Sequence, residues 1–150
     1  MKGMKKLVLS ILACLSAGLI GSLFTFSSIP TWYKTLVKPP FSPPNWVFGP
    51  VWTMLYVLMG IALSLIWKKR GARTLFLIHL AFNAGWSIVF FGLHSITGGM
   101  VVIIILWGLI VALIRAFYRI DRRASYLLIP YLVWVSFASI LNFSLLLLNR

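Results

Sequence analysis

The chain has 150 residues, of which 61% are hydrophobic and 10% are charged, and its mean hydropathy is +1.01. Soluble domains carry roughly 25% charged residues, so this composition excludes a water-soluble globular protein and predicts an integral membrane protein. Fourteen lysines and arginines against one acid, Asp121, give a net charge of +13. Such a charge also suits nucleic-acid binding, but the basic residues cluster between apolar runs, which is typical of cytoplasmic loops. We therefore expect a lipid bilayer, and no nucleic acid, as partner.

Five apolar runs are long enough to cross a bilayer as helices, which takes about 20 residues each. They lie at about residues 7–27, 46–67, 74–94, 99–118 and 124–148. Short turns join the later runs, and only the connection at 28–45 is long. The sequence therefore predicts an all-α integral membrane bundle of five transmembrane helices that forms a single domain over residues 1–150.

Three of these runs carry small residues at every fourth position. The first has Ala13, Ala17 and Gly21, the third has Ala81 and Gly85, and the fourth has Gly108, Ala112 and Ala116. Small residues at this spacing allow helices in lipid to approach closely. They join helices either within the bundle, which is the default, or between two copies of the chain.

The basic residues also predict the orientation, because the cytoplasmic ends of membrane helices are enriched in lysine and arginine. With a cytoplasmic N-terminus, eleven of the fourteen basic residues lie inside, and only Lys34, Lys38 and Arg150 lie outside. The opposite orientation reverses this ratio. We therefore expect the N-terminus inside, and the C-terminus and the 28–45 connection outside.

The long connection leads into a proline-rich segment, KPPFSPPNWVFGPVW (38–52). Its prolines hold φ at about −65° and restrict the residues before them, so ordering this segment costs little conformational entropy. We expect residues 28–45 to form a preordered lid across the outer mouth of the bundle; a rigid connector is the alternative. Trp32, Tyr33 and Trp46 act as membrane-interface anchors or as ligand contacts. Asn45 is placed to cap the second helix.

Aromatic residues recur at helical spacing on three of the spans. Residues three or four positions apart share one face of a helix. Such faces are formed by Trp52 and Tyr56, by Asn83, Trp86 and Phe90, and by Trp134, Phe137, Ala138, Leu141 and Asn142. With the predicted orientation, all three faces lie in the middle or outer half of the bundle. Aromatic walls with a few uncharged polar groups suit a large, flat, mostly apolar ligand; the alternative is that these residues are bundle core.

The sequence offers little conventional catalytic chemistry. It contains no glutamate, and Asp121 lies among arginines in a predicted turn, where a solvated ion pair is expected. Paired-carboxylate catalysis is thereby excluded, no catalytic residue is assigned, and neither a metal site nor a required cofactor is predicted. His79 shares a face with Asn83, so it either ligates a haem iron or bonds a neighbouring helix, which is the commoner role. His94, at the outer end, is expected to be solvated.

Three blocks resemble the signature of the translocator protein family, also called TspO or peripheral-type benzodiazepine receptors. They are WYKTLVKPPFSPPNWVFGPVWTMLY (32–56), LAFNAGWSIVFFG (80–92) and PYLVWVSFASILN (130–142). They follow the family order along the chain, and the family has five spans. The resemblance implies a membrane protein that binds porphyrins, and in many members benzodiazepine-type drugs, under the loop between the first two helices. Members are commonly homodimers.

Carried over to this chain, the resemblance implies a ligand pocket built from the lid and three helices. The candidate residues are Trp32, Tyr33, Pro43, Trp52, Tyr56, Asn83, Trp86, Phe90, Trp134, Phe137, Ala138 and Asn142. Phe143 stands where the cholesterol motif of animal members has tyrosine, which disfavours steroid binding. The short basic start and the charge bias suit a bacterial plasma membrane.

On this basis we expect the protein to bind tetrapyrroles such as protoporphyrin IX in the aromatic pocket. Some members of the family promote light-driven oxidative breakdown of bound porphyrin, and the porphyrin is then both photosensitiser and substrate. A transporter that moves porphyrins across the bilayer and a ligand sensor without turnover are the alternatives, which the sequence does not separate.

Overall fold

The computed structural model describes residues 2–150, which are helical apart from the connecting segments. The long helices are α1 (Gly3–Ser28), α2 (Phe48–Leu65), α3 (Arg70–Ser87), α4 (Ile96–Tyr118) and α6 (Ile129–Leu148), and the short α5 (Arg122–Leu127) precedes α6. A π-helix, η3 (Ile88–Gly92), continues α3, and two 3-10 turns, η1 (Tyr33–Thr35) and η2 (Asn45–Val47), lie between α1 and α2. Within this range, five spans are long and apolar enough to cross a membrane: α1, η2 with α2, α3 with η3, α4, and α5 with α6. The predicted all-α bundle of five spans is confirmed.

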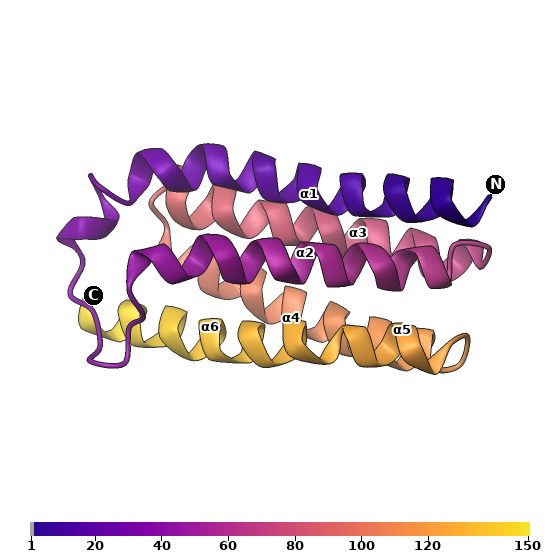
Figure 1. Cartoon of the computed structure of the whole chain (residues 1–150). Coiled ribbons are helices and arrows are strands. Elements are labelled where there is room, and N and C mark those ends of the chain that lie inside the picture. Colours follow the sequence, from indigo (N-terminus) through magenta and orange to yellow (C-terminus); the bar gives the residue numbers. More distant parts are fainter. Residues whose placement is uncertain (1) are drawn as a thin grey trace.

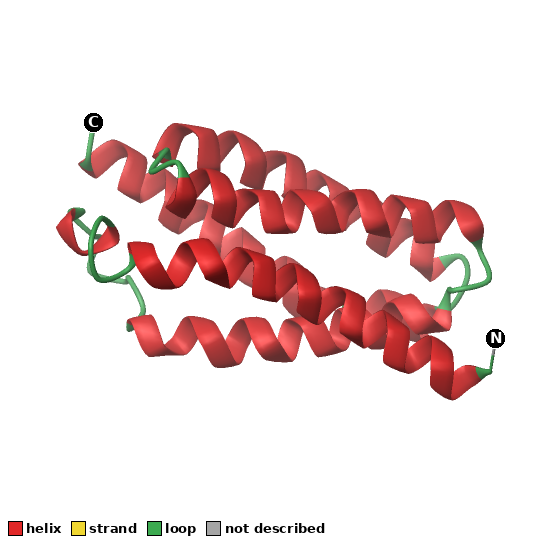
Figure 2. Cartoon of the chain, turned by 90° about the horizontal axis from the view of Figure 1, so that it is seen from above, coloured by secondary structure: helices red, strands yellow, loops and turns green. Residues whose placement is uncertain are grey.

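The five spans lie side by side along their lengths (Figure 1). α1 contacts α2 and α3, α4 contacts α3 and α6, and α2 contacts α5, so the helices close a ring around a common interior. Residues 28–45, called the lid segment below, lie at one end of the bundle beside the C-terminus, whereas the N-terminus lies at the opposite end (Figures 1 and 2). Which end faces the cytoplasm stays a prediction.

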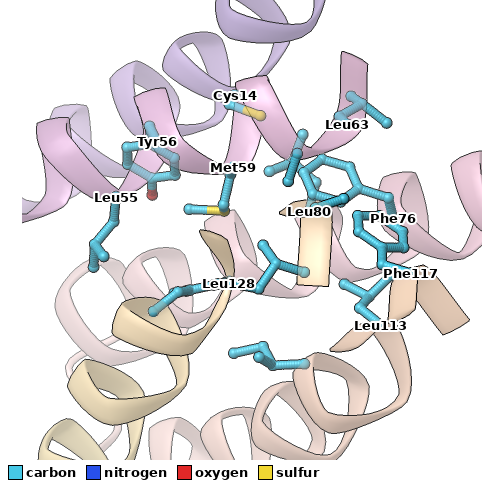
Figure 3. Packing of buried hydrophobic residues seen from close by; sticks show 14 of the residues in the cluster. Cys14, Leu55, Tyr56, Met59, Leu63, Phe76, Leu80, Leu113, Phe117 and Leu128 are labelled. Atoms are coloured by element: carbon cyan, nitrogen blue, oxygen red, sulfur yellow. The ribbon is translucent and has the colours of Figure 1, made fainter. Parts of the chain in front are cut away.

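Apolar side chains fill the interior of the bundle away from the lid segment. Met59, Phe76 and Phe117 meet there from α2, α3 and α4 (Figure 3), and all three are fully buried. The rings of Phe76 and Phe117 stack with their centroids 6.2 Å apart. Lipid tails are as apolar as these side chains, so the contacts stabilise the bundle through close packing.

α1 and α2 approach so closely that two glycines are needed between them. A Cβ at Gly60 would lie 2.6 Å from the Cα of Ile11, and a Cβ at Gly18 would lie 2.5 Å from the ring of Tyr56. The small-residue ladder of α1 also packs within the bundle, where Ala17 is buried. Small residues therefore bring α1 against its neighbours, as expected for helices in lipid.

Two spans depart from regular α-helix, which the sequence pattern does not predict. The third span becomes a π-helix at Ile88, and the N–H of Leu93 donates to the Ile88 carbonyl at 2.9 Å. The fifth span is divided at Leu128, whose N–H donates to the Ser125 carbonyl at 3.1 Å. Pro130 has no N–H to continue the α-helical ladder, and it lies in the first turn of α6, where proline is tolerated.

Two expectations about helix ends have different outcomes. Asp121 forms the expected ion pair with Arg123 at 2.9 Å and also caps α5 by accepting the Arg123 backbone N–H at 2.9 Å. The hydrogen bond from Arg123 holds the pKa of Asp121 below its usual value. Asn45, by contrast, does not cap α2, which has Val47 at its N-cap and no side-chain cap bond. The intervening 3-10 turn moves Asn45 away from the capping position.

Candidate functional site

A cavity of about 380 Å³ lies beneath the lid segment and is lined by residues of α1, α2, α3, α4 and α6. Nine of the twelve candidate residues line it, namely Tyr33, Trp52, Tyr56, Asn83, Trp86, Phe90, Trp134, Ala138 and Asn142. The structure therefore brings the aromatic faces of α2, α3 and α6 together around one space. Their binding of a ligand remains a proposal.

The other three candidates, Trp32, Pro43 and Phe137, lie outside the lining. Trp32 packs edge-on against Phe90, with ring centroids 5.4 Å apart, and stacks on His94 at 4.7 Å. Phe137 packs against a phenylalanine of the lid segment, with ring centroids 6.2 Å apart. Trp32 and Phe137 therefore pack against two residues of the cavity lining, Phe90 and Trp134, and the exposed His94 is held against the Trp32 ring.

α1 supplies a wall that the aromatic pattern does not predict. Gly18, Ser22 and Thr25 line the cavity from α1, and Asn45 and Phe48 line it from the start of the second span. The three α1 residues are spaced four and three apart, so they share one helix face. This run of small and hydroxyl-bearing residues is the sequence signal for the missing wall.

The lid segment is held in shape by Lys38. Its Nζ donates to the Tyr33 carbonyl at 2.8 Å and lies 4.6 Å from the centroid of the Tyr33 ring. Tyr33 is buried and lines the cavity. Burial raises the pKa of the Tyr33 phenol, so this roof residue stays uncharged.

Stacked aromatic pairs form two of the cavity walls. The rings of Trp52 and Tyr56 on α2 have centroids 5.6 Å apart, and those of Trp86 and Phe90 on the third span have centroids 4.9 Å apart. Such rings provide a large, rigid and mostly apolar contact surface. The walls therefore suit a ligand that is itself flat and apolar.

The polar groups on the walls differ in how far they are already engaged. Asn142 accepts a hydrogen bond from Trp86 Nε1 at 3.1 Å and donates one to the Ile96 carbonyl at 3.1 Å, so its amide already links α6 to two other helices. Trp134 Nε1 is buried and has no hydrogen-bond partner within residues 2–150. An unsatisfied buried donor costs about 1–3 kcal/mol.

A buried chain of hydrogen bonds forms the floor. The Tyr56 hydroxyl donates to Asn83 Oδ1 at 2.6 Å, and Asn83 Nδ2 donates to the Tyr131 oxygen at 2.7 Å. His79 Nε2 lies 2.9 Å from the Tyr131 oxygen, and His79 Nδ1 lies 2.8 Å from the Phe76 carbonyl oxygen. His79 therefore bonds a neighbouring helix, which confirms the commoner of its two expected roles. Across the described chain, no cluster of three His, Cys, Asp or Glu side chains comes together that could hold a metal ion.

Five spans around an aromatic cavity, with a proline-rich segment across one end, define a multi-pass helical membrane protein. The chain belongs to the TspO/MBR family, whose model matches residues 10–148. This confirms the family predicted from the sequence blocks.

Similarity to individual members extends over most of the chain. It is 49% identical over 150 residues to the Tryptophan-rich protein TspO of Chlorobaculum tepidum, covering 95% of each chain. It is 37% identical to the Protein CrtK of Rhodobacter capsulatus, covering 91% of this chain and 88% of that one. Identity to the human Translocator protein is 36%, covering 83% of this chain and 78% of that one. With its five spans and bacterial relatives, the chain is a multi-pass protein of a bacterial membrane.

Proposed function

We propose that this protein binds a tetrapyrrole such as protoporphyrin IX in the aromatic cavity. The observation that carries the proposal is the mostly apolar, aromatic lining of the cavity, which includes the stacked pairs Trp52–Tyr56 and Trp86–Phe90. A tetrapyrrole has two broad, mostly apolar faces that suit contact with such aromatic walls. The cavity volume of about 380 Å³ falls within the range of roughly 300–1,000 Å³ for small-molecule sites. Benzodiazepine-type compounds, which are also largely aromatic and apolar, are expected to compete for the same space.

The lid segment closes over the bound ligand. Tyr33 lines the cavity from the lid, and Lys38 ties the following residues back onto Tyr33. A roof that is ordered before binding reduces the entropy lost when a ligand is enclosed. In this proposal the chain acts as a single domain whose helices bind the ligand and whose lid slows its release.

Light converts the bound tetrapyrrole from ligand to substrate. An excited porphyrin transfers energy to dioxygen, and the reactive oxygen species that results oxidises the macrocycle. Trp52, Trp86 and Trp134 hold the macrocycle in place and are also the side chains most exposed to the excited state. No acid or base group is required for this chemistry, which is compatible with a chain that contains no glutamate.

Purified protein mixed with protoporphyrin, kept in light or in darkness, tests both steps by absorbance and mass spectrometry. We expect binding in both conditions and an oxidised product only in light. A Trp134→Phe variant keeps an aromatic ring but offers a smaller contact surface, and we expect its affinity to fall about two- to tenfold. Bound but chemically unchanged porphyrin would instead assign the protein to carriage or sensing. Absence of binding would contradict the proposal as a whole.

Two copies associate in the membrane through the small-residue face of α4. Gly108 and Ala112 are exposed there, and no atom of another described helix lies within 4 Å of a Cβ built at Gly108. A face of this kind allows two helices to approach closely. Cross-linking of Ala112→Cys in a Cys14→Ser background tests the interface, with the exposed α6 position Val133→Cys as control. A dimer cross-linked through Val133→Cys but not through Ala112→Cys would place the interface elsewhere.

A further inference from the structure

The hydrogen bonds below the cavity have a fixed direction, which follows from His79. Its Nδ1 lies 2.8 Å from the Phe76 carbonyl oxygen. A carbonyl only accepts hydrogen bonds, so Nδ1 carries a proton. The ring is fully buried, and the only acid of the chain, Asp121, pairs with Arg123 in an exposed turn. A buried cation without a counter-ion is costly, so the ring is neutral and its Nε2 is an acceptor.

The direction of each further bond follows from this one. The Tyr131 hydroxyl donates to His79 Nε2 over 2.9 Å, so its oxygen is free to accept from Asn83 Nδ2 over 2.7 Å. Asn83 Oδ1 then accepts the hydroxyl hydrogen of Tyr56 over 2.6 Å. A tyrosine has a single O–H hydrogen, so Tyr56 has no donor left, but its oxygen can still accept. Tyr56 lines the cavity, whereas His79 and Tyr131 do not.

We propose that His79 is a positioning residue that sets the hydrogen-bonding polarity of the cavity floor. Acting through Tyr131 and Asn83, it turns the Tyr56 O–H away from the cavity, so that Tyr56 accepts a hydrogen bond from a ligand and does not donate one. The floor therefore selects ligands that present an N–H or O–H at this place over ligands that present a carbonyl. The inference rests on the proposed function only in taking the cavity as the ligand site.

Removal of the imidazole acceptor reverses the direction of the hydrogen bonds between Tyr131, Asn83 and Tyr56. In a His79→Leu variant, the Tyr131 hydroxyl loses its acceptor, and the carbonyl oxygen of Asn83 is the remaining partner once that amide turns over. Asn83 Nδ2 then donates to the Tyr56 oxygen, and the Tyr56 O–H turns into the cavity as a donor. Buried polar groups strongly favour arrangements in which each donor is satisfied. A residue outside the cavity thus decides which ligands the cavity prefers.

Three flat tricyclic compounds of nearly equal size test this selectivity. Carbazole carries an N–H donor, 9-fluorenone carries a carbonyl acceptor, and fluorene carries neither. Binding to the full chain in lipid nanodiscs is followed by quenching of tryptophan fluorescence. We expect carbazole to bind the unmodified protein about two- to tenfold more tightly than fluorene. In His79→Leu, carbazole should bind no more tightly than fluorene, and 9-fluorenone should bind about two- to tenfold more tightly than fluorene. In Tyr56→Phe, neither carbazole nor 9-fluorenone should bind more tightly than fluorene.

A matched control separates this effect from general disturbance of the core. Phe117 is fully buried and stacks on Phe76, but its side chain has no part in the hydrogen-bond chain. We expect Phe117→Leu to leave the carbazole-to-fluorenone ratio unchanged. An equal ratio in His79→Leu and the unmodified protein would overturn the inference while leaving the cavity as a ligand site. Failure of all three compounds to bind would reject the ligand site itself, and the inference with it.

The tautomer of His79 is measurable in the chain without altering the hydrogen-bond network. The chain has two histidines, so a His94→Gln background leaves His79 as the only imidazole. Nitrogen-15 chemical shifts then report which ring nitrogen carries the proton. We expect a protonated Nδ1 and an unprotonated Nε2. A proton on Nε2 would reverse every bond up to Tyr56 and refute the proposed polarity.

Discussion

The side-chain amide of Asn149 forms two hydrogen bonds with the backbone of Val37. Its Oδ1 accepts from the Val37 N–H at 2.8 Å, and its Nδ2 donates to the Val37 carbonyl at 2.9 Å. Asn149 lies at the C-terminal end of α6, and Val37 lies in the lid segment. Backbone groups outside regular structure need such partners, so this pair fixes the lid against the last span.

Replacement of Asn149 by leucine is expected to loosen the lid. Both bonds lie at the exposed surface, so we expect a loss of only about 0.5–1.5 kcal/mol. Bound porphyrin should then leave about two- to tenfold faster, and the Val37 amide should exchange its hydrogen faster. Ser144→Ala is the control, because its hydroxyl bonds only the Ile140 carbonyl of the same helix. Unchanged exchange at Val37 in Asn149→Leu would show that the amide does not hold the lid.

The stiffness of the lid is expected to matter more than its polarity. Replacing Pro39, Pro40, Pro43 and Pro44 by glycine keeps the length but restores backbone freedom. Ordering a residue costs about 1–2 kcal/mol, so closure should be penalised and porphyrin should be released faster. The thermal unfolding midpoint should change little, because the bundle contacts lie in the helices. Release at the original rate would show that the segment is only a connector.

Loss of a cavity tryptophan is expected to weaken porphyrin binding. Trp52→Ala and Trp134→Ala each remove an aromatic surface, which contributes about 0.5–1.5 kcal/mol beyond its buried area. Trp107 is the matched control: it lies outside the cavity, is 42% exposed and donates to Ser136 Oγ at 2.8 Å. Fluorescence titration measures all three. If Trp107→Ala alone weakens binding, the ligand site is misplaced.

Close approach of α1 and α2 predicts a strong effect of a single methyl group. A Cβ at Gly60 meets the backbone of Ile11 at 2.6 Å, so Gly60→Ala forces the helices apart and should cost about 1–3 kcal/mol. Gly85→Ala on α3 meets nothing within 4 Å and should change stability by no more than about 1 kcal/mol. Unfolding in detergent measures the difference. Equal stability of the two variants would contradict the packing described for α1 and α2.

The orientation of the bundle is a prediction of its own. We expect the C-terminus outside, because only three of the fourteen basic residues then lie outside. A reporter that is active only in the cytoplasm should be inactive when fused after Arg150 and active when fused before Lys2. The reverse pattern would invert the topology, although the cavity and lid would keep their places at one end of the bundle.

The sequence alone was sufficient to predict the number of spans, the family and the aromatic residues that line the cavity from α2, the third span and α6. Span length depends on bilayer thickness, and the face shared by Trp86 and Phe90 depends on the period of the helix. Both properties depend only on the local sequence, so they can be predicted without knowing which other helices pack against the span. The α1 wall around Gly18 was missed because it carries no aromatic signal, and Asn45 was misplaced because a 3-10 turn precedes α2.

Which polar groups meet was decided only by the tertiary structure. Partners such as Asn83 and Tyr131, or Val37 and Asn149, lie 48 and 112 positions apart in the chain. Their meeting depends on the rotation and axial offset of each helix, which follow from close packing at residues such as Gly60 and not from the helical period. The same packing left Trp134 Nε1 without a partner while it engaged both nitrogens of His79. The sequence therefore determined which faces are aromatic, and packing determined which of their polar groups are bonded to one another.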